Sequence, residues 1–194
     1  KGGEHLLDLI NDVLDLAKIE AGKVELSIEN IASLDIITEC RELVDEVAAK
    51  RHITITTPDA GQNTRLIRAD YTRVKQVCLN LMSNAIKYNL EGGSISISLE
   101  EVNAGLLRFS VSDTGPGIPL EKQSGLFTAF NRLGAENSDI EGTGIGLVVS
   151  RDLIEMMEGK IGFDSTEGVG STFWFELPLC QNQGDEQAAS VKTV

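Results

Sequence analysis

The 194-residue sequence lacks the features that mark secreted or membrane-spanning proteins. Its three cysteines, Cys40, Cys78 and Cys180, are widely spaced and form no C-x-x-C pair, which indicates reduced thiols. No apolar run approaches the roughly 20 residues that span a bilayer, and no signal peptide is visible. We expect a cytoplasmic location without direct membrane contact. Because "KGGEHLL" already opens inside a helical pattern, we interpret the chain as a fragment of a longer protein, whose own anchoring is left open.

Basic residues are also scarce. Lys and Arg number 17 against 30 Asp and Glu, so the formal net charge is −13. Such an acidic surface argues against nucleic acid as a partner. A phosphate ligand is still compatible with this net charge. Glycine loops, a few cations and a metal ion can create a locally positive site on an acidic protein. The sequence has no P-loop motif, G-x-x-x-x-G-K-[ST], so any nucleotide would bind without a Walker lysine.

Hydrophobic periodicity predicts an α+β fold. Helices are expected at residues 4–21, 33–50, 70–88 and 147–158, and strands at 23–31, 52–57, 65–68, 94–102, 105–113, 160–166 and 171–179. Gly22 suits a helix C-terminus, and Ser33 and Asp70 suit N-caps. The last four strands are expected to form two hairpins. This order favours a two-layer α/β sandwich, a mixed and mostly antiparallel sheet covered on one face by helices, plus an N-terminal helix.

The stretch "NLMSNAIKYN" places two amides and a lysine in an apolar helix. On a helical wheel, one apolar face contains Val74, Val77, Cys78, Leu81, Ala85 and Tyr88, and a separate polar stripe contains Arg73, Gln76, Asn80, Asn84 and Lys87. A solvated helix face would explain the stripe. However, asparagine is a poor helix former, whereas an amide oxygen can ligate Mg²⁺ and a lysine can hold phosphates.

Two glycine-rich segments follow. In "SDTGPGI", Asp113 either caps a turn or accepts a hydrogen bond from a ligand amino group, and Gly115 and Gly117 allow close backbone approach. In "EGTGIGL", three glycines at positions 142, 144 and 146 lead into a helix, where free backbone N–H groups favour anions. Between them, Phe127 and Phe130 in "LFTAFNRLG" form a hydrophobic latch, and "GAENSDI" suits a mobile lid.

Taken together, these motifs resemble the ATP-binding catalytic domain of sensor histidine kinases, within the superfamily shared with DNA gyrase B, MutL and the large heat-shock chaperone. "NLMSNAIKYN" resembles the asparagine box, "DTGPGI" and "EGTGIGL" the two glycine boxes, and "LFTAFNR" the phenylalanine box. "HLLDLINDVLDLAKIEAGKVEL" is similar to the second helix of the dimerisation and phosphotransfer hairpin that precedes this domain in histidine kinases. The resemblance implies a Bergerat-type fold. It divides the chain into residues 1–22 (hairpin helix), 23–179 (catalytic domain) and 180–194 (disordered tail or linker).

The resemblance also implies the site residues. Asn84 would ligate Mg²⁺, Asn80 and Lys87 would contact phosphates as the candidate catalytic residues, Tyr88 would lie near the adenine, and Asp113 would accept from its amino group. The remaining cofactor-binding candidates are Gly115, Gly117, Ile118, Phe130, Arg132, Gly142, Thr143, Gly144, Ile145, Gly146, Leu147 and Thr172. Arg132 is either a γ-phosphate contact or a solvated side chain.

Neither histidine fits the phosphoacceptor pattern of this family, a His followed by an acid. His5 precedes two leucines, and His52 opens a strand. We therefore expect a catalytic fragment that binds ATP and Mg²⁺ and transfers the γ-phosphate to a histidine on a helix absent from this chain, without autophosphorylation of its own. A response regulator receiver domain is the expected partner, and a homodimer through Leu7, Ile10, Leu14 and Ala17 is a further candidate. A serine protein kinase of the same superfamily and an ATP-dependent binding module are the alternatives.

Overall fold

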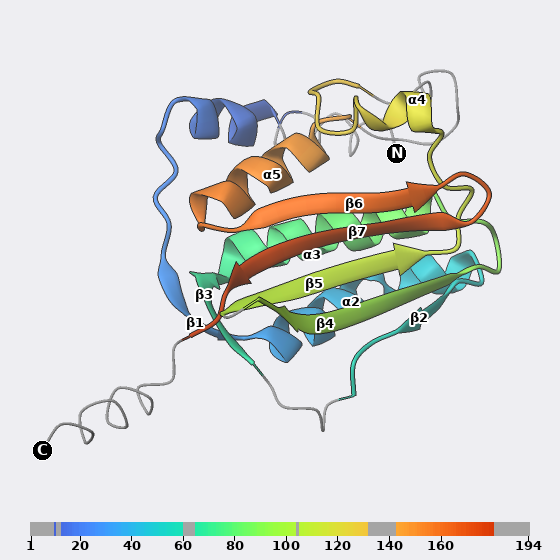
Figure 1. Cartoon of the computed structure of the whole chain (residues 1–194), viewed down its shortest axis with the longest axis horizontal. Coiled ribbons are helices and arrows are strands. Elements are labelled where there is room, and N and C mark those ends of the chain that lie inside the picture. The colour runs from blue at the N-terminus through green and yellow to red at the C-terminus, as the bar shows by residue number, and fades with distance from the viewer. Residues whose placement is uncertain (1–9, 11–12, 60–64, 104, 132–142, 181–194) are drawn as a thin grey trace, which may run out of the picture.

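The computed structural model describes residues 10, 13–59, 65–103, 105–131 and 143–180, and these form a sheet layer and a helix layer (Figure 1). A helix at residues 13–20 comes first. The elements after it are β1 (Ile28–Ala32), α2 (Ser33–Lys50), β2 (Thr54–Thr56), β3 (Leu66–Asp70), α3 (Tyr71–Lys87), β4 (Ser94–Val102), β5 (Leu106–Asp113), α4 (Leu120–Gln123), α5 (Gly146–Met156), β6 (Lys160–Thr166) and β7 (Gly170–Pro178). Within the described residues, no helix has the length and apolarity that a membrane span requires.

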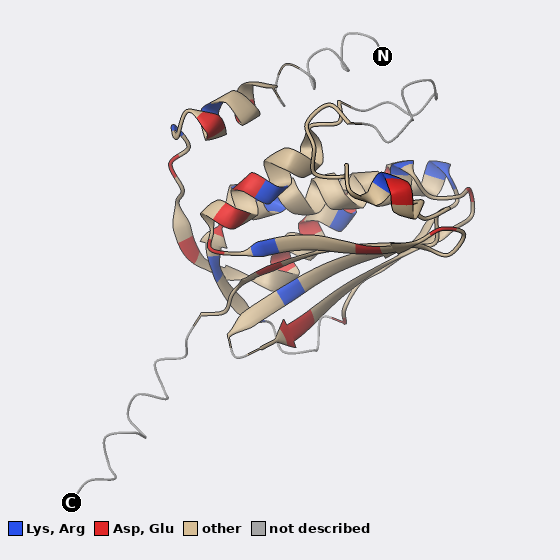
Figure 2. Ribbon diagram, turned by 45° about the horizontal axis from the view of Figure 1, so that its top comes forward, with Lys and Arg blue, Asp and Glu red and all other residues tan. Residues whose placement is uncertain are grey.

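The main sheet has five strands in the order β2-β4-β5-β7-β6. β2 runs parallel to β4, and the other neighbours are antiparallel. The helices cover one face of this sheet, as Figure 2 shows with the helices lying above the strands. The predicted α+β sandwich with a mixed, mostly antiparallel sheet is therefore confirmed. A separate two-stranded sheet pairs β1 with β3, a pairing that the local pattern did not indicate.

The core lies between the inner face of the sheet and α3. Phe109 of β5 and Phe175 of β7 stack on this face with ring centroids 4.7 Å apart. The predicted apolar face of α3 is buried except at its last residue, since Tyr88 is 39% exposed. α3 packs against α2 on one side and α5 on the other, so its polar edge has a helix as neighbour.

The helix ends test the three predicted caps. Asp70 caps α3, because its side chain accepts a hydrogen bond of 3.0 Å from the Arg73 N–H. Gly22 adopts a φ of +63° and ends the first helix, with the Lys23 N–H donating to the Lys18 carbonyl at 2.9 Å. The Ser33 cap is wrong. Ala32 is the N-cap of α2 and makes no side-chain capping bond, and Ser33 is the first helical residue, fully buried.

Candidate nucleotide-binding site

The polar edge of α3 meets the second glycine box at Asn80. Asn80 Nδ2 donates to the Ser150 hydroxyl of α5 at 2.8 Å, and Asn84 Nδ2 donates to Asn80 Oδ1 at 3.3 Å. A Cβ atom on Gly146 would lie 2.5 Å from Asn80 Oδ1. Only glycine therefore lets the start of α5 approach the amide this closely. Among the described residues, no hydrogen bond reaches Asn84 Oδ1, so this oxygen keeps its capacity to accept.

The same edge meets the first glycine box at its other end. A Cβ atom on Gly115 would lie 2.7 Å from the Tyr88 carbonyl oxygen, so the turn after β5 packs backbone against backbone on the end of α3. Asn84 and Lys87 are both half-buried. They lie along α3 between Asn80 and Tyr88, and thus between the two glycine boxes. One helix edge therefore carries all the predicted phosphate and metal contacts of the asparagine box.

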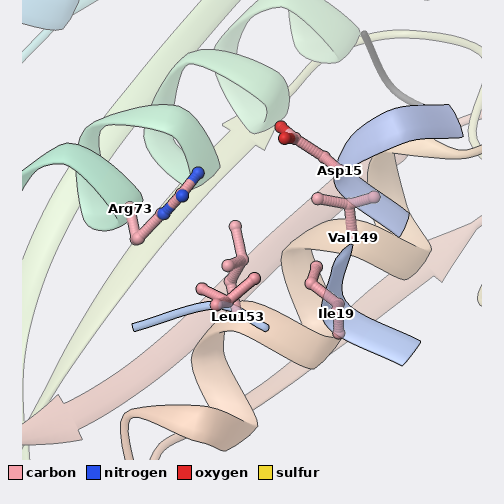
Figure 3. Close-up of a pocket in the computed structure, with 6 residues that line it drawn as sticks. Asp15, Ile19, Arg73, Val149 and Leu153 are labelled. Atoms are coloured by element: carbon pink, nitrogen blue, oxygen red, sulfur yellow. The ribbon is translucent and has the colours of Figure 1, made fainter. Parts of the chain in front are cut away.

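The first part of the polar stripe serves a different contact. Gln76 Nε2 donates to Asp15 Oδ2 of the N-terminal helix at 2.9 Å, and Arg73 Nη1 donates to Gln76 Oε1 at 3.0 Å. Figure 3 shows Asp15 and Arg73 directed toward a shared space, which Ile19, Val149 and Leu153 also line. The stripe thus divides, with its first turns holding the N-terminal helix and its last turns facing the glycine boxes.

Asp113 ends β5 at the mouth of the first glycine box. Its carboxylate accepts a hydrogen bond of 2.8 Å from the Gly115 N–H. Burial raises the pKa of Asp113, and the backbone N–H groups of Gly115 and Ser171 partly oppose this rise. Asp113 therefore makes the turn bond that the simpler interpretation requires. Its second carboxylate oxygen keeps acceptor capacity for a ligand.

Gly117 and Ile118 connect this turn to the last hairpin. Gly117 has a φ of +68°, and a Cβ atom there would lie 2.1 Å from the Thr166 carbonyl oxygen. The Ile118 N–H donates to the Ser165 hydroxyl at 2.9 Å. The Cβ positions of Gly115 and Gly117 thus face protein backbone. Both glycines are needed to assemble the pocket wall itself.

The structure does not bring Thr172, the residue expected to support the adenine, to the face of β7 that Asp113 shares. In the β5–β7 register, Thr172 pairs with Ser112, and their hydroxyl oxygens are 2.8 Å apart. Side chains alternate along a strand. Thr172 therefore lies on the sheet face opposite the core, whereas Ser171 pairs with Asp113, lies on its face and is buried. We identify Ser171 as the hydroxyl next to Asp113.

The phenylalanine box meets the second glycine box at Phe130. This residue has a φ of +63°, is 62% exposed, and donates its N–H to the Gly144 carbonyl at 3.1 Å. Phe127 accepts a hydrogen bond from Arg151 of α5 on its carbonyl oxygen, at 3.2 Å. Arg132, Gly142 and the predicted lid segment between them lie outside the described residues. Phe130 and Gly144, on either side of that segment, are thus joined by a hydrogen bond, and Phe127 joins the phenylalanine box to α5.

The residues around the start of α5 are mainly packing residues. Ile145 is fully buried, and Leu147 is half-buried against the core. The Thr143 hydroxyl accepts from the Ile145 N–H at 3.3 Å. The burial of Ile145 and the close approach of Gly146 to Asn80, described above, therefore fix the position of the α5 N-terminus. These features set the direction in which its backbone N–H groups point.

Comparison with known proteins identifies the family. The profile of the histidine kinase-, DNA gyrase B- and HSP90-like ATPases matches residues 69–181. The chain belongs to this family. It is similar to the circadian input-output histidine kinase CikA of Synechococcus elongatus, with 38% identity over 91% of this chain and 24% of that protein. It is also 36% identical to the sensor protein GacS of Pseudomonas syringae pv. syringae, over 96% of this chain and 21% of that protein.

The fold of full-length ShkA in complex with AMPPNP matches this histidine kinase domain with a TM-score of 0.80 and 32% identity, over 93% of this chain and 37% of that chain. The resemblance to sensor histidine kinases that the motifs indicate is therefore confirmed. The chain spans about a fifth to a quarter of the length of these curated relatives.

Sequence reasoning missed two buried polar residues of this histidine kinase domain. Ser150 is 2% exposed and holds the Asn80 amide. Asn89 is 5% exposed, and its Nδ2 donates to the Ser94 carbonyl at 3.1 Å. The signal for Ser150 was a serine on the otherwise apolar "LVVSRDLI" face of α5. The signal for Asn89 was a third asparagine within the asparagine box.

Proposed function

We propose that this chain binds Mg-ATP along the polar edge of α3 and that the longer protein transfers the γ-phosphate to a histidine outside this chain. One observation carries the proposal. The α3 edge contacts Gly146 of the second glycine box at Asn80 and Gly115 of the first at Tyr88, with Asn84 and Lys87 between them. A single helix edge thus spans the distance from a base-binding turn to a helix N-terminus suited to phosphates.

Different residues of the chain bind the adenine, bind the phosphates and flank the lid. Asp113 binds the adenine amino group through the remaining acceptor capacity of its carboxylate, with Tyr88 and Ile118 at the pocket wall. Lys87 and Asn80 bind and orient the phosphates. Gly144, Gly146 and the backbone around Thr143 shape the phosphate end, and Ile145 and Leu147 anchor it. Phe130, Arg132 and Gly142 flank the lid. Positioning and charge stabilisation by such groups account for most phosphoryl-transfer catalysis.

Asn84 is the residue that would hold Mg²⁺, through Oδ1. The described residues include no group of three or more His, Cys, Asp or Glu side chains that could hold a metal ion. One amide ligand fits Mg²⁺, because this ion keeps several waters and takes substrate phosphate oxygens as further ligands. When bound, Mg²⁺ neutralises phosphate charge.

The proposed partners are a phosphoacceptor helix outside this chain and a receiver domain. His52, the one histidine among the described residues, lies with a φ of 54° in the turn after α2 rather than on a helix. The phosphoacceptor helix is therefore sought in the longer protein. Histidine kinase ThkA in complex with the response regulator TrrA matches this fold with a TM-score of 0.69 and 29% identity, over 90% of this chain and 49% of that chain. This similarity supports a receiver domain as partner.

The N-terminal helix offers the candidate dimer surface. Leu16 and Ile19 pack against the catalytic core, while Ile10, Val13 and Leu14 are exposed by 46%, 41% and 50%. Residues 1–22 would thus belong to a helical hairpin that dimerises with the same hairpin of a second copy. Residues 23–179 would form the catalytic domain, and residues 180–194 a linker. Sedimentation at high concentration tests this: concentration-dependent dimers support it, and a strict monomer opposes it.

Calorimetric titration of the chain with ATP tests the main proposal. In Mg²⁺ the wild type should bind, and Asn84→Ala should bind at least about tenfold more weakly, because one metal ligand is lost. The difference should shrink when EDTA removes Mg²⁺. Ser83→Ala is the matched control, since Ser83 is the exposed neighbour of Asn84 on α3. Equal affinity of Asn84→Ala and wild type in Mg²⁺ would contradict the metal role.

Labelling with γ-labelled ATP tests the transfer step. The isolated chain should stay unlabelled, and a histidine-containing hairpin segment of the longer protein should become labelled when mixed with it. The bond to the histidine nitrogen forms as the bond to the ADP oxygen breaks, so acid should remove the label. Strong labelling of a histidine within this chain would overturn the proposed division.

A further inference from the structure

Arg51 joins the end of α2 to the end of α3. It is the C-cap residue of α2, and its guanidinium donates to the carbonyl oxygens of Ile86, Lys87 and Asn89. The bonds to Lys87 and Asn89 measure 2.9 Å each. The Arg51 carbonyl in turn accepts from the Gly92 N–H at 3.0 Å. One side chain therefore ties down the backbone on both sides of Tyr88.

This contact fits the chemistry of a helix C-terminus. The last four carbonyls of an α-helix have no intrahelical partner, and they carry the negative end of the helix dipole. A planar guanidinium offers five donors in a fixed geometry and stays charged. Arg51 therefore gives donors to three carbonyls at and just beyond the helix end, of which Ile86 also accepts from the Asn89 N–H at 3.4 Å. A lysine with one compact ammonium can do this only in part.

The backbone that Arg51 holds also fixes the first glycine box. Asn89 Oδ1 accepts from the Leu90 N–H at 2.9 Å and from the Thr114 hydroxyl at 3.4 Å. The Thr114 hydroxyl also accepts from the Ser94 N–H at 2.9 Å. Thr114 directly follows Asp113, the adenine-binding candidate. A continuous chain of hydrogen bonds thus runs from Arg51 through Asn89 to the base-binding turn.

We propose that Arg51 is a positioning residue for the nucleotide: by holding the carbonyls at the end of α3, it sets where Lys87, Tyr88 and the Asp113 turn stand relative to one another. Arg51 itself has no role as a ligand contact here, because its guanidinium is engaged with the backbone. The inference rests on the proposed ATP site.

Calorimetric titration of the full chain with Mg-ATP tests the proposal. Arg51→Met should bind about tenfold more weakly than wild type, because charge-assisted hydrogen bonds are lost and the carbonyls are released. Arg51→Lys should recover part of the affinity. The matched control is Arg41→Met on the same helix, whose guanidinium reaches Thr57 and Asp45 instead. It should bind within about twofold of wild type.

A double-mutant cycle separates positioning from general stability. Because part of the effect of Arg51 acts through Lys87, Arg51→Met should weaken binding less in the Lys87→Ala background than in the wild type. Additive losses, or unchanged binding by folded Arg51→Met, would overturn the proposal. If Arg51→Met does not fold, Arg51→Lys decides: weaker binding at unchanged thermal stability supports the proposal, and wild-type binding overturns it. Failure of the wild type to bind Mg-ATP would instead overturn the proposed ATP site.

Discussion

Asn80 and Ser150 form a hydrogen bond of 2.8 Å between α3 and α5, with the Asn80 amide as donor. The bond joins the asparagine box to the helix that the second glycine box begins. Because Asn84 donates to the other end of the same amide, the orientation of Asn80 also affects Asn84. The hydroxyl of Ser150 is thus part of what holds the proposed metal and phosphate ligands in place.

Replacing Ser150 by alanine should weaken both the fold and nucleotide binding. The Asn80 Nδ2 would lose its acceptor, and because Asn80 is half-buried we expect a loss of about 1 kcal/mol, the low end of the cost of an unsatisfied donor. Urea unfolding would measure the stability, and calorimetric titration the affinity for Mg-ATP. Ser83→Ala is the control, since the exposed Ser83 hydroxyl donates only to the Asn80 backbone carbonyl. Equal losses in the two variants would contradict this role of Ser150.

Replacing Asp113 by asparagine should separate binding from stability. Burial raises the pKa of Asp113 above its ordinary 3.8, so the folded state favours the neutral form. An acid of this kind contributes stability below its unfolded pKa and loses that contribution as the pH rises through its folded pKa. At neutral pH the carboxylate therefore works against folding, and Asp113→Asn should unfold at the same or a higher temperature than wild type.

The same variant should bind ATP about tenfold or more weakly, because a charged acceptor for the adenine amino group is lost. Inosine triphosphate provides the comparison, since its base has a carbonyl in place of the amino group. It should bind wild type and variant similarly. A variant that keeps full affinity for ATP would exclude Asp113 as the adenine acceptor.

Local patterns predicted the elements that local physics determines. The Asp70 cap and the period of "YTRVKQVCLNLMSNAIK" define α3, and the two hairpins follow from alternation around short turns. The burial of the α3 apolar face was predictable for the same reason. Ser33 failed as a cap because tertiary packing, which buries it completely, outweighs its local capping preference.

Long-range register could not be predicted in this way. Ser171 and Thr172 are adjacent polar residues, and only the pairing of β7 with β5 decides which of them shares a face with Asp113. The same holds for Arg51, whose carbonyl partners lie 35 to 38 residues further along the chain. The pairing of β1 with β3 likewise joins segments that α2 and β2 separate in the sequence. The residues of the motifs were thus predictable from the sequence. The residues elsewhere in the chain that hold them in place, such as Arg51 and Ser171, were not.

Tyr71 should titrate unusually late. A hydrogen bond to Glu39 raises the pKa of Tyr71 from 10.0 to about 12, with burial and the charge of Glu39 acting in the same direction. This neutral phenol contributes stability fully below pH 10, and the contribution is lost as the pH rises toward 12. The ultraviolet absorbance of tyrosinate would show the late phase.

Matched variants assign this phase, because the chain has two tyrosines. Tyr71→Phe should remove the late phase and Tyr88→Phe should leave it. Glu39→Gln should move it to lower pH, since the charged acceptor is gone. Loss of the late phase in Tyr88→Phe would assign the shifted pKa to the nucleotide site instead.

Arg108 on the outer sheet face should matter more for stability than an exposed ion pair does. Its Nε donates to Glu176 Oε1 at 2.9 Å, and its guanidinium carbon lies 4.2 Å from the ring centroid of Trp174. The Glu176 side chain is 7% exposed, so Arg108→Met would leave a nearly buried carboxylate without its cation. Since Arg108 itself is 32% exposed, we expect a loss of about 2–3 kcal/mol rather than the full cost of a buried pair.

Urea unfolding, followed by the fluorescence of the single tryptophan, would measure this loss. Lys50→Met is the control, because Lys50 and Glu46 form a pair of 2.7 Å whose side chains are 70% and 81% exposed. It should change the stability by no more than about 0.5 kcal/mol. Adding Glu176→Gln to Arg108→Met should recover part of the loss, since the unpaired charge disappears. If Glu176→Gln recovers none of the loss, the unpaired charge of Glu176 does not explain it, and the packing of Arg108 on Trp174 carries the stability.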